Sequence, residues 1–217
     1  MKKELTIENL LKEAKKFVEI ESKYSEPAIY GSTDGKAIGT YLEHKFVTYL
    51  DQKFTYLKGN SAKGVDLPSV EVDIKVTSIN QPQSSSPFKS ARQKIFGLGY
   101  SLLVFVYEKK DNHKTKTANL NFLHTVFVEK SKTSDFQTTS GLIKILENEG
   151  NKDDLIAFML EKNLPIDDIE AEKIAEEILS KKIELGYLTI SNALQWRLQY
   201  GRVIQKAGEI DGIIRIK

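Results

Sequence analysis

The sequence predicts an α/β fold in which helices cover a central sheet, and three observations support this prediction. Residues 70–78 alternate between apolar and polar side chains, as expected for a strand with one buried face. Residues 100–107 are nearly all apolar, which is typical of a central strand covered on both faces. Before and after these strands, apolar residues recur at spacings of three and four, the period of amphipathic helices.

The first part of the chain is expected to contain two helices and three strands. Apolar residues at helical spacing predict a helix over residues 6–23, with Thr6 as its candidate N-cap. A loop rich in turn residues follows, and a second helix is predicted over residues 36–51. Strands are predicted next at 53–58, 64–68 and 70–78.

The middle of the chain is predicted to contain a polar loop, a helix and two strands. The loop at 81–87 has no apolar period, and a short helix at 89–97 is expected to end at Gly97. A basic turn at 109–116 then separates the strand at 100–107 from another at 119–129.

Beyond about residue 133 the pattern becomes helical. Four helices are predicted, at 139–149, 152–161, 166–185 and 189–200. The tail at 202–216 alternates like a β-hairpin, and with the last helix it fits a winged-helix-like arrangement. Because no low-complexity linker separates two halves, we expect a core in residues 1–130. An attached, mainly helical subdomain for recognition and assembly is expected in residues 131–217.

Composition narrows the functional classes. The chain has 217 residues, a net charge of +2 and no cysteine, which excludes disulfides, thiol catalysis and cysteine-bound zinc and fits a cytoplasmic setting. No apolar stretch is long enough to cross a membrane, and the first residues lack the apolar core of a signal peptide. The chain also lacks a glycine-rich phosphate loop, and its three histidines have no metal-ligand spacing. A nucleotide-driven motor and a zinc hydrolase are therefore not expected.

The strand at 70–78 carries the strongest chemical signal. Asp73 and Lys75 lie on its polar face, and Asp66 stands seven residues before Asp73. If residues 65–67 pair beside this strand, two carboxylates and an ammonium group converge. Carboxylates hold a hard cation such as Mg²⁺, and a lysine can orient water and neutralise charge, so the cluster predicts metal-dependent phosphodiester hydrolysis. Glu71 shares this face and competes with Asp73 as the second metal ligand, and a merely solvated charged face is the alternative.

The run of Asp66, six residues and Asp73-Ile74-Lys75 resembles the core signature of the PD-(D/E)XK nuclease superfamily. The spacing is most similar to that of type II restriction endonucleases and of the mismatch-repair nicking enzyme MutH, although Val65 replaces the usual proline. The predicted order of helix, three strands, helix and strand also resembles the superfamily core. The resemblance implies a restriction-endonuclease-like core with a mixed central sheet flanked by helices.

The resemblance also implies a set of metal-site residues. Many restriction enzymes carry a glutamate on the helix before the first motif strand, and Glu43 occupies that position here. The implied ligands of Mg²⁺, for which Mn²⁺ can substitute, are Asp66, Asp73, Glu43 and the main-chain carbonyl of Ile74. Lys75 would position the attacking water, and cleavage would leave 5′-phosphate ends. An ordinary solvent-facing helix glutamate is the alternative for Glu43.

Two segments are rich in side chains suited to contact with DNA. Serine and glutamine hydrogen-bond to base edges and phosphates, while lysine and arginine hold the backbone and guanine. In the resembling enzymes the elements after the lysine strand approach DNA, and the helix predicted at 189–200 carries further donors. A solvated loop, and a helix that Trp196 simply anchors to the core, are the alternatives. The candidate DNA-contacting residues are Ser78, Gln81, Gln83, Ser84, Ser85, Ser86, Lys89, Arg92, Gln93, Lys94, Asn192, Gln195 and Arg197.

These features together predict a type II site-specific endonuclease that cuts double-stranded DNA with Mg²⁺. Most enzymes of this kind are homodimers that read palindromes, and they work beside a DNA methyltransferase of the same specificity. A MutH-like nicking or repair endonuclease is the first alternative. The second is a non-catalytic DNA-binding protein whose acidic strand only faces solvent.

Overall fold

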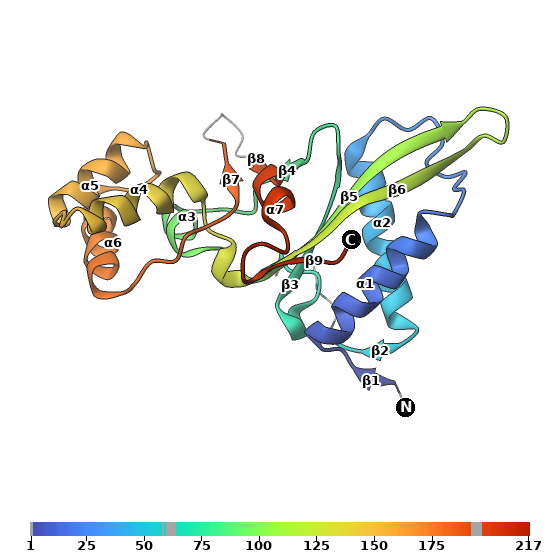
Figure 1. Cartoon of the computed structure of the whole chain (residues 1–217), viewed down its shortest axis with the longest axis horizontal. Helices are drawn as coiled ribbons and strands as arrows, with labels where there is room; N and C mark the ends of the chain where they lie inside the picture. The colour runs from blue at the N-terminus through green and yellow to red at the C-terminus, as the bar shows by residue number, and fades with distance from the viewer. Residues whose placement is uncertain (1, 58, 60–63, 192–196) are drawn as a thin grey trace.

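The structure is a computed structural model, and it describes residues 2–57, 59, 64–191 and 197–217. Its centre is a mixed sheet of four strands, β3 (Val72–Ser78), β5 (Ser101–Asn112), β6 (Thr117–Val128) and β9 (Ile213–Arg215), in the order β3–β5–β6–β9. β3 runs parallel to β5, and the other two pairs are antiparallel. Figure 1 shows β5 and β6 as the long hairpin that crosses the molecule. The predicted α/β fold with helices around a mixed sheet is confirmed.

Two helices, α1 (Ile7–Glu21) and α2 (Gly35–Asp51), cover one face of this sheet, as predicted. Thr6 caps α1, because its hydroxyl accepts the N–H of Asn9, and Asp34 caps α2 in the same way. Phe17 of α1 and Phe46 of α2 pack against Phe105 of β5, edge to face or tilted. The first predicted strand is shorter than expected: β2 (Phe54–Thr55) pairs only with β1 (Lys3–Glu4).

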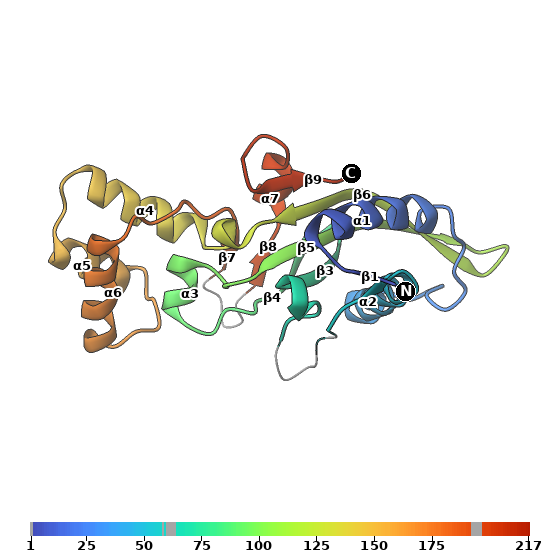
Figure 2. The same cartoon turned by 90° about the horizontal axis from the view of Figure 1, so that it is seen from below.

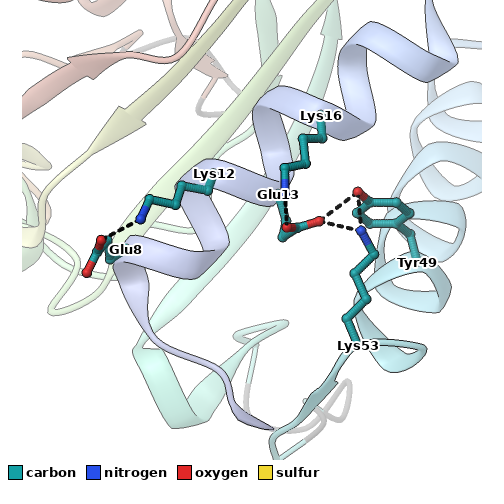
Figure 3. Close-up of polar contacts among 6 residues, drawn as sticks. All are labelled: Glu8, Lys12, Glu13, Lys16, Tyr49 and Lys53. Atoms are coloured by element: carbon teal, nitrogen blue, oxygen red, sulfur yellow. Dashed lines mark hydrogen bonds and ion pairs between the residues drawn. The ribbon is translucent and has the colours of Figure 1, made fainter. Parts of the chain in front are cut away.

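A buried carboxylate fastens α1 to α2 (Figure 3). Glu13 of α1 accepts hydrogen bonds from Lys16 on its own helix and from Tyr49 and Lys53 at the end of α2. Burial works against the charge of Glu13, but these donors outweigh it and lower the pKa of Glu13 to about 2. The neighbouring pair of Glu8 and Lys12 stays within α1 and is exposed, so it holds no second element in place.

The other face of the central sheet is also covered, so β5 is buried on both sides, as its apolar sequence predicts. Leu102, Val104 and Val106 of β5 pack here against the short helix α7 (Gly201–Lys206) and its preceding residue Tyr200. β5 continues beyond the predicted strand to Asn112, so the turn occupies only residues 113–116.

A separate helical unit has a core of its own. It contains α3 (Ala91–Phe96), α4 (Phe136–Glu147), α5 (Lys152–Glu161) and α6 (Asp168–Ser180), packed around buried residues that include Ile95, Leu142 and Ile174. This unit lies at the opposite end of the molecule from α1 and α2 (Figures 1 and 2). The four helices were predicted, and Gly97 ends α3 with a positive φ of 88°.

The prediction of a helix over residues 189–200 is wrong. The described residues of this segment form β7 (Thr189–Ile190) and β8 (Arg197–Gln199), which pair antiparallel and continue onto β4 (Gln83–Ser85). The buried residues Leu188 and Ile190, and then Leu198 and Tyr200, are two positions apart, which is the period of a strand. Asn192, Gln195 and Trp196 lie outside the described residues.

The predicted hairpin at 202–216 is wrong in its first half. Val203 and Ala207, four positions apart, are buried by the helix α7, and only the second half is a strand, β9. A turn between Gly208 and Gly212, both with positive φ, brings β9 beside β6 of the central sheet. The tail thus belongs to the central sheet, and a winged-helix arrangement is not formed. No described helix is long and apolar enough to cross a membrane.

Candidate active site

The edge strand β3 carries an acid and a lysine on the same face. Val72 and Ile74 are fully buried on one side, and Asp73 and Lys75 point to the other. Asp73 is only 3% exposed, and the Lys75 ammonium lies 2.5 Å from its Oδ2. Within the described residues this oxygen accepts no hydrogen bond of good geometry. A carboxylate oxygen has more than one lone pair, and the contact with Lys75 uses at most one of them, so this oxygen is still available to a cation.

Asp66 reaches the same strand from a bend that precedes it. Leu67 forms a single bridge with Val72, and the short 3₁₀ helix η1 (Pro68–Val70) makes the turn between them, so the strand predicted at 64–68 is reduced to one bridge. The Asp66 carboxylate accepts the main-chain N–H of Ile74 at 2.8 Å, on the free edge of β3. The N–H and C=O of one strand residue point to the same side, so the Ile74 carbonyl also faces this edge.

Glu43 approaches β3 from the helix α2. Gly39, one turn earlier on α2, lies against Val76 of β3: a Cβ at Gly39 would be in ordinary van der Waals contact with Val76, at 3.9 Å. Glu43 is half-buried, and burial raises its pKa to about 7. The charge of Asp66 raises this pKa further, Lys75 lowers it and Asp73 raises it, so all three charges lie within electrostatic reach of Glu43.

Three carboxyl groups, those of Glu43, Asp66 and Asp73, lie near a single positive charge, that of Lys75, so ionising all three together is unfavourable. Burial raises the pKa of Asp73 to about 7; Lys75 counteracts this, and the nearby carboxylate of Asp66 adds to it. In the described part of the chain, no group of three or more His, Asp or Glu side chains converges as a complete metal cage. Mg²⁺ nevertheless needs only one or two carboxylates because it keeps several water ligands. The buried Oδ2 of Asp73, beside Asp66 and the outward carbonyl of Ile74, therefore fits such an ion.

Glu71 does not share the face of Asp73. It precedes the strand with a left-handed φ of 53°, and its exposed carboxylate pairs with Lys130 at 2.9 Å. The turn at η1 rotates this residue out of the strand alternation. Its expected place on the polar face is therefore wrong, and Asp73 is the carboxylate that faces Lys75.

Two tyrosines near the site were not predicted from the sequence. Tyr100 precedes β5, and burial together with the charges of Asp73 and Asp66 raises its pKa to about 12. Tyr200 is completely buried, and its hydroxyl lies 2.6 Å from that of Ser84. Burial raises the pKa of Tyr200, and Asp73 contributes in the same direction. Tyr100 opens an apolar strand and Tyr200 closes a segment predicted as a helix, so neither position marks a site residue in the sequence.

The structure divides the predicted DNA-contacting residues of the first segment. Ser78, Gln81, Gln83, Ser84, Ser85, Ser86 and Lys89 are exposed or half-exposed, and Gln83, Ser84 and Ser85 form β4. Arg92 pairs with Glu177 of α6 at 2.6 Å, and the Gln93 side chain accepts the main-chain N–H of Lys89.

Lys94 is buried among the helices and is only 2% exposed. Burial lowers its pKa, so this lysine does not offer a phosphate-binding charge at the surface. Its predicted contact with DNA is incompatible with this position. Arg197, in contrast, is half-exposed on β8, where it pairs with Ser85 of β4. The structure therefore brings the two predicted DNA-contacting segments together in one small sheet.

An acid and a lysine side by side on the edge strand of a mixed sheet are an arrangement suited to metal-dependent phosphodiester hydrolysis. Comparison with known proteins identifies the particular kind of enzyme. The family model described as "Type II restriction enzyme NspV" matches residues 4–215. The chain is also 62% identical over 212 residues to Type II restriction enzyme NspV of Nostoc sp., which covers 98% of this chain and 96% of that protein. No solved structure matches the chain.

The chain therefore belongs to the NspV family of type II restriction enzymes. The predicted enzyme class, a type II restriction endonuclease that cuts DNA at specific sites, is confirmed by this membership.

Proposed function

We propose that the chain is a PD-(D/E)XK endonuclease that hydrolyses double-stranded DNA at a short sequence and requires Mg²⁺. One observation carries the proposal. Asp66, Asp73 and Lys75 meet at the free edge of β3, and the buried Oδ2 of Asp73 lies 2.5 Å from the Lys75 ammonium without a hydrogen bond of good geometry among the described residues. A solvated charged face would leave these side chains exposed. Asp73 is instead buried, and its burial raises its pKa, which is typical of a functional carboxyl group.

Each residue at this edge has a separate role. Asp66, Asp73 and Glu43, with the carbonyl of Ile74, would hold Mg²⁺ or Mn²⁺. When bound, such an ion polarises the phosphate and lowers the pKa of a water molecule. Lys75 holds that water for in-line attack and offsets negative charge as the phosphorus–oxygen bond to the 3′ oxygen breaks. The products would carry a 5′-phosphate and a 3′-hydroxyl.

The proposal extends to the partners of the enzyme. Two copies would act as a homodimer, because a two-fold axis in the protein matches the symmetry of a palindromic site. A DNA methyltransferase of the same specificity would protect the DNA of the host. Both would work in the cytoplasm, where a chain without cysteine needs no oxidising conditions.

The test is a digest of long unmethylated DNA with the purified protein, in Mg²⁺ or in EDTA. Lys75→Ala and Asp73→Asn are compared with Lys15→Ala and Asp153→Asn, which change exposed residues of α1 and α5. We expect discrete fragments that need Mg²⁺, persist in both controls, and form at least roughly 10²–10³-fold more slowly in the two site variants. Sequencing the ends gives the site and the stagger.

Other outcomes favour the alternatives. Nicks in one strand only would indicate a MutH-like enzyme. Equal cleavage by wild type and Lys75→Ala would contradict the proposed site, and sequence-specific binding without any cleavage would indicate a non-catalytic DNA-binding protein.

A further inference from the structure

The sheet formed by β4, β8 and β7 turns one face to the protein core. β8 lies between the other two strands, and Leu198 in its middle pairs with Ser84 on one side and with Ile190 on the other. Leu198 and Ile190 are buried, and the Ser84 hydroxyl contacts that of the buried Tyr200. Because side chains alternate along a strand, the residues that flank these three point away from the core.

The outward face of this sheet is polar throughout. All of its side chains are exposed or half-exposed, and in the described part of the chain none of them makes a hydrogen bond or an ion pair. One row across the three strands contains Gln83, Gln199 and Thr189, and a second row contains Ser85 and Arg197. Figures 1 and 2 show the three strands between the helical unit and the central sheet. Five unpartnered donors and acceptors thus share one surface.

The size and chemistry of this face suit the edges of bases. Strands lie roughly 4.8 Å apart, so one row spans roughly 10 Å, and rows two residues apart are separated by roughly 7 Å. The major groove is roughly 12 Å wide, and two base-pair steps rise by roughly 7 Å. Glutamine binds adenine through two hydrogen bonds, and arginine binds guanine in the same way. Serine and threonine can accept from or donate to either.

The same sheet is fixed to the strand that carries Lys75. Thr77 follows Lys75 by two positions on β3, is buried, and faces the same side. Its hydroxyl accepts the main-chain N–H of Gln83 at 3.0 Å and lies 3.0 Å from the carbonyl oxygen of Gln83, to which it can donate. A reading surface held in this way has a defined position relative to the site of cleavage.

We propose that this polar face is the base-reading surface of the enzyme, inserted in the major groove, with Gln83 and Gln199 reading adenine and Arg197 reading guanine. The inference rests on the proposed endonuclease function and extends it to the residues that set the recognised sequence. Gln199 and Thr189 join the predicted contacts because the register of the sheet places them in one row with Gln83.

The experiment uses a library of duplexes with a randomised window, in two arms. Wild-type protein cleaves the library in Mg²⁺, and the Lys75→Ala protein selects bound duplexes in Mg²⁺ without cleaving them. Gln83→Leu, Gln199→Leu and Arg197→Lys are then made in both backgrounds. Gln205→Leu, an exposed glutamine of α7, is the matched control, and the melting temperatures confirm that all variants fold. Arg197→Lys keeps the positive charge and loses the planar guanidinium group that can make two parallel hydrogen bonds.

We expect each variant to lose preference at one base pair, or at its symmetry mate as well if two copies act together. The preference for adenine at that position should fall roughly 10- to 100-fold in each glutamine variant, and the preference for guanine should fall by the same factor in Arg197→Lys. The preferences at the other positions should not change. The control should keep the full pattern. Uniform loss at all positions, or no change, would overturn the inference.

The two arms separate this inference from the proposed function. Specific cleavage with an unaltered pattern in every variant would refute the reading face and leave the endonuclease intact. Selection of a sequence by the Lys75→Ala protein, relaxed by the three variants, would support the reading face even if wild type failed to cut. A protein that neither cuts nor selects any sequence would refute both.

Discussion

Replacing Asp73 by asparagine should stabilise the protein in the absence of metal while it removes cleavage. The carboxyl of Asp73 is buried, and its pKa is raised from 3.8 to about 7. A raised pKa means that the folded state binds the proton more tightly than the unfolded chain does. The carboxylate therefore opposes folding once the pH exceeds the unfolded pKa, and the penalty is complete above the folded pKa. Asparagine is the matched substitution, because it keeps the shape of the side chain and carries no charge.

The size of the effect follows from this shift. A change of about three pKa units corresponds to roughly 4 kcal/mol of unfolding free energy above about pH 7. Asp73 lies 2.5 Å from Lys75 and also interacts with Asp66. The substitution therefore also removes the attraction to Lys75, and the net effect is smaller than the full shift. We expect a net gain of about 1–3 kcal/mol for Asp73→Asn, or roughly 3–10 °C in melting temperature for a chain of this size.

Thermal unfolding in EDTA measures the effect at about pH 5 and about pH 8. The gain should be complete at the higher pH and less than half as large at the lower one, which lies between the unfolded value of 3.8 and the folded value of about 7; it should vanish only below about pH 3.8. Added Mg²⁺ should then stabilise wild type and not the variant, because a ligand stabilises only the state that binds it. Asp153→Asn should change neither result. An Asp73→Asn protein that melts below wild type at the higher pH in EDTA would refute the reasoning.

Three further predictions concern the contact between α1 and α2, the anchor of β4 and the metal. Glu13→Gln should cost roughly 1–2 kcal/mol near neutral pH in urea unfolding, with Glu8→Gln as the near-silent control. Because the pKa of Glu13 is lowered to about 2, wild type should keep this stabilisation above the ordinary value of 4.5 and lose it as the pH falls toward 2. Thr77→Val should free Gln83 and slow single-turnover cleavage by roughly tenfold, while the Mg²⁺-dependent melting shift persists; loss of both would show a general folding defect. Removal of metal with EDTA should stop cleavage, and Mg²⁺ or Mn²⁺ should restore it; cleavage that continues in EDTA would contradict the metal requirement.

The chemistry of β3 could be predicted from the sequence because strand alternation is a local property. Once residues 72–78 form a strand, Asp73 and Lys75 must share a face, whatever the rest of the chain does. Glu43 was named from the resemblance to restriction enzymes, and its place next to the buried Leu42 on α2 agrees with that prediction. The position of Glu71 was not predictable, because a left-handed residue before the strand breaks the alternation.

Contacts between distant segments could not be predicted in this way. Residues 189–200 have apolar positions that fit a helix, and only their pairing with β4, far earlier in the chain, makes the described part into strands. Lys94 was predicted to contact DNA because it belongs to a segment rich in polar and basic residues after the strand of Lys75. Lys94 is buried, and the helices α4 to α6, which pack against its own helix α3, come from another part of the chain. In both cases tertiary packing overrides the local pattern.

One strand, β3, carries both the residues of the proposed active site and the anchor of the proposed reading surface. Asp73, Lys75 and Thr77 follow one another at intervals of two on β3, so the acid, the cation and the anchor of Gln83 all face the same side. A shift of β3 by one residue would turn all three into the core formed with α1 and α2. A base that displaces β4 therefore displaces Gln83, and through Thr77 it disturbs the strand that holds Lys75. If the reading face acts as proposed, a wrong base should lower the rate of cleavage more than it lowers binding, and comparing both on single-mismatch duplexes measures that difference.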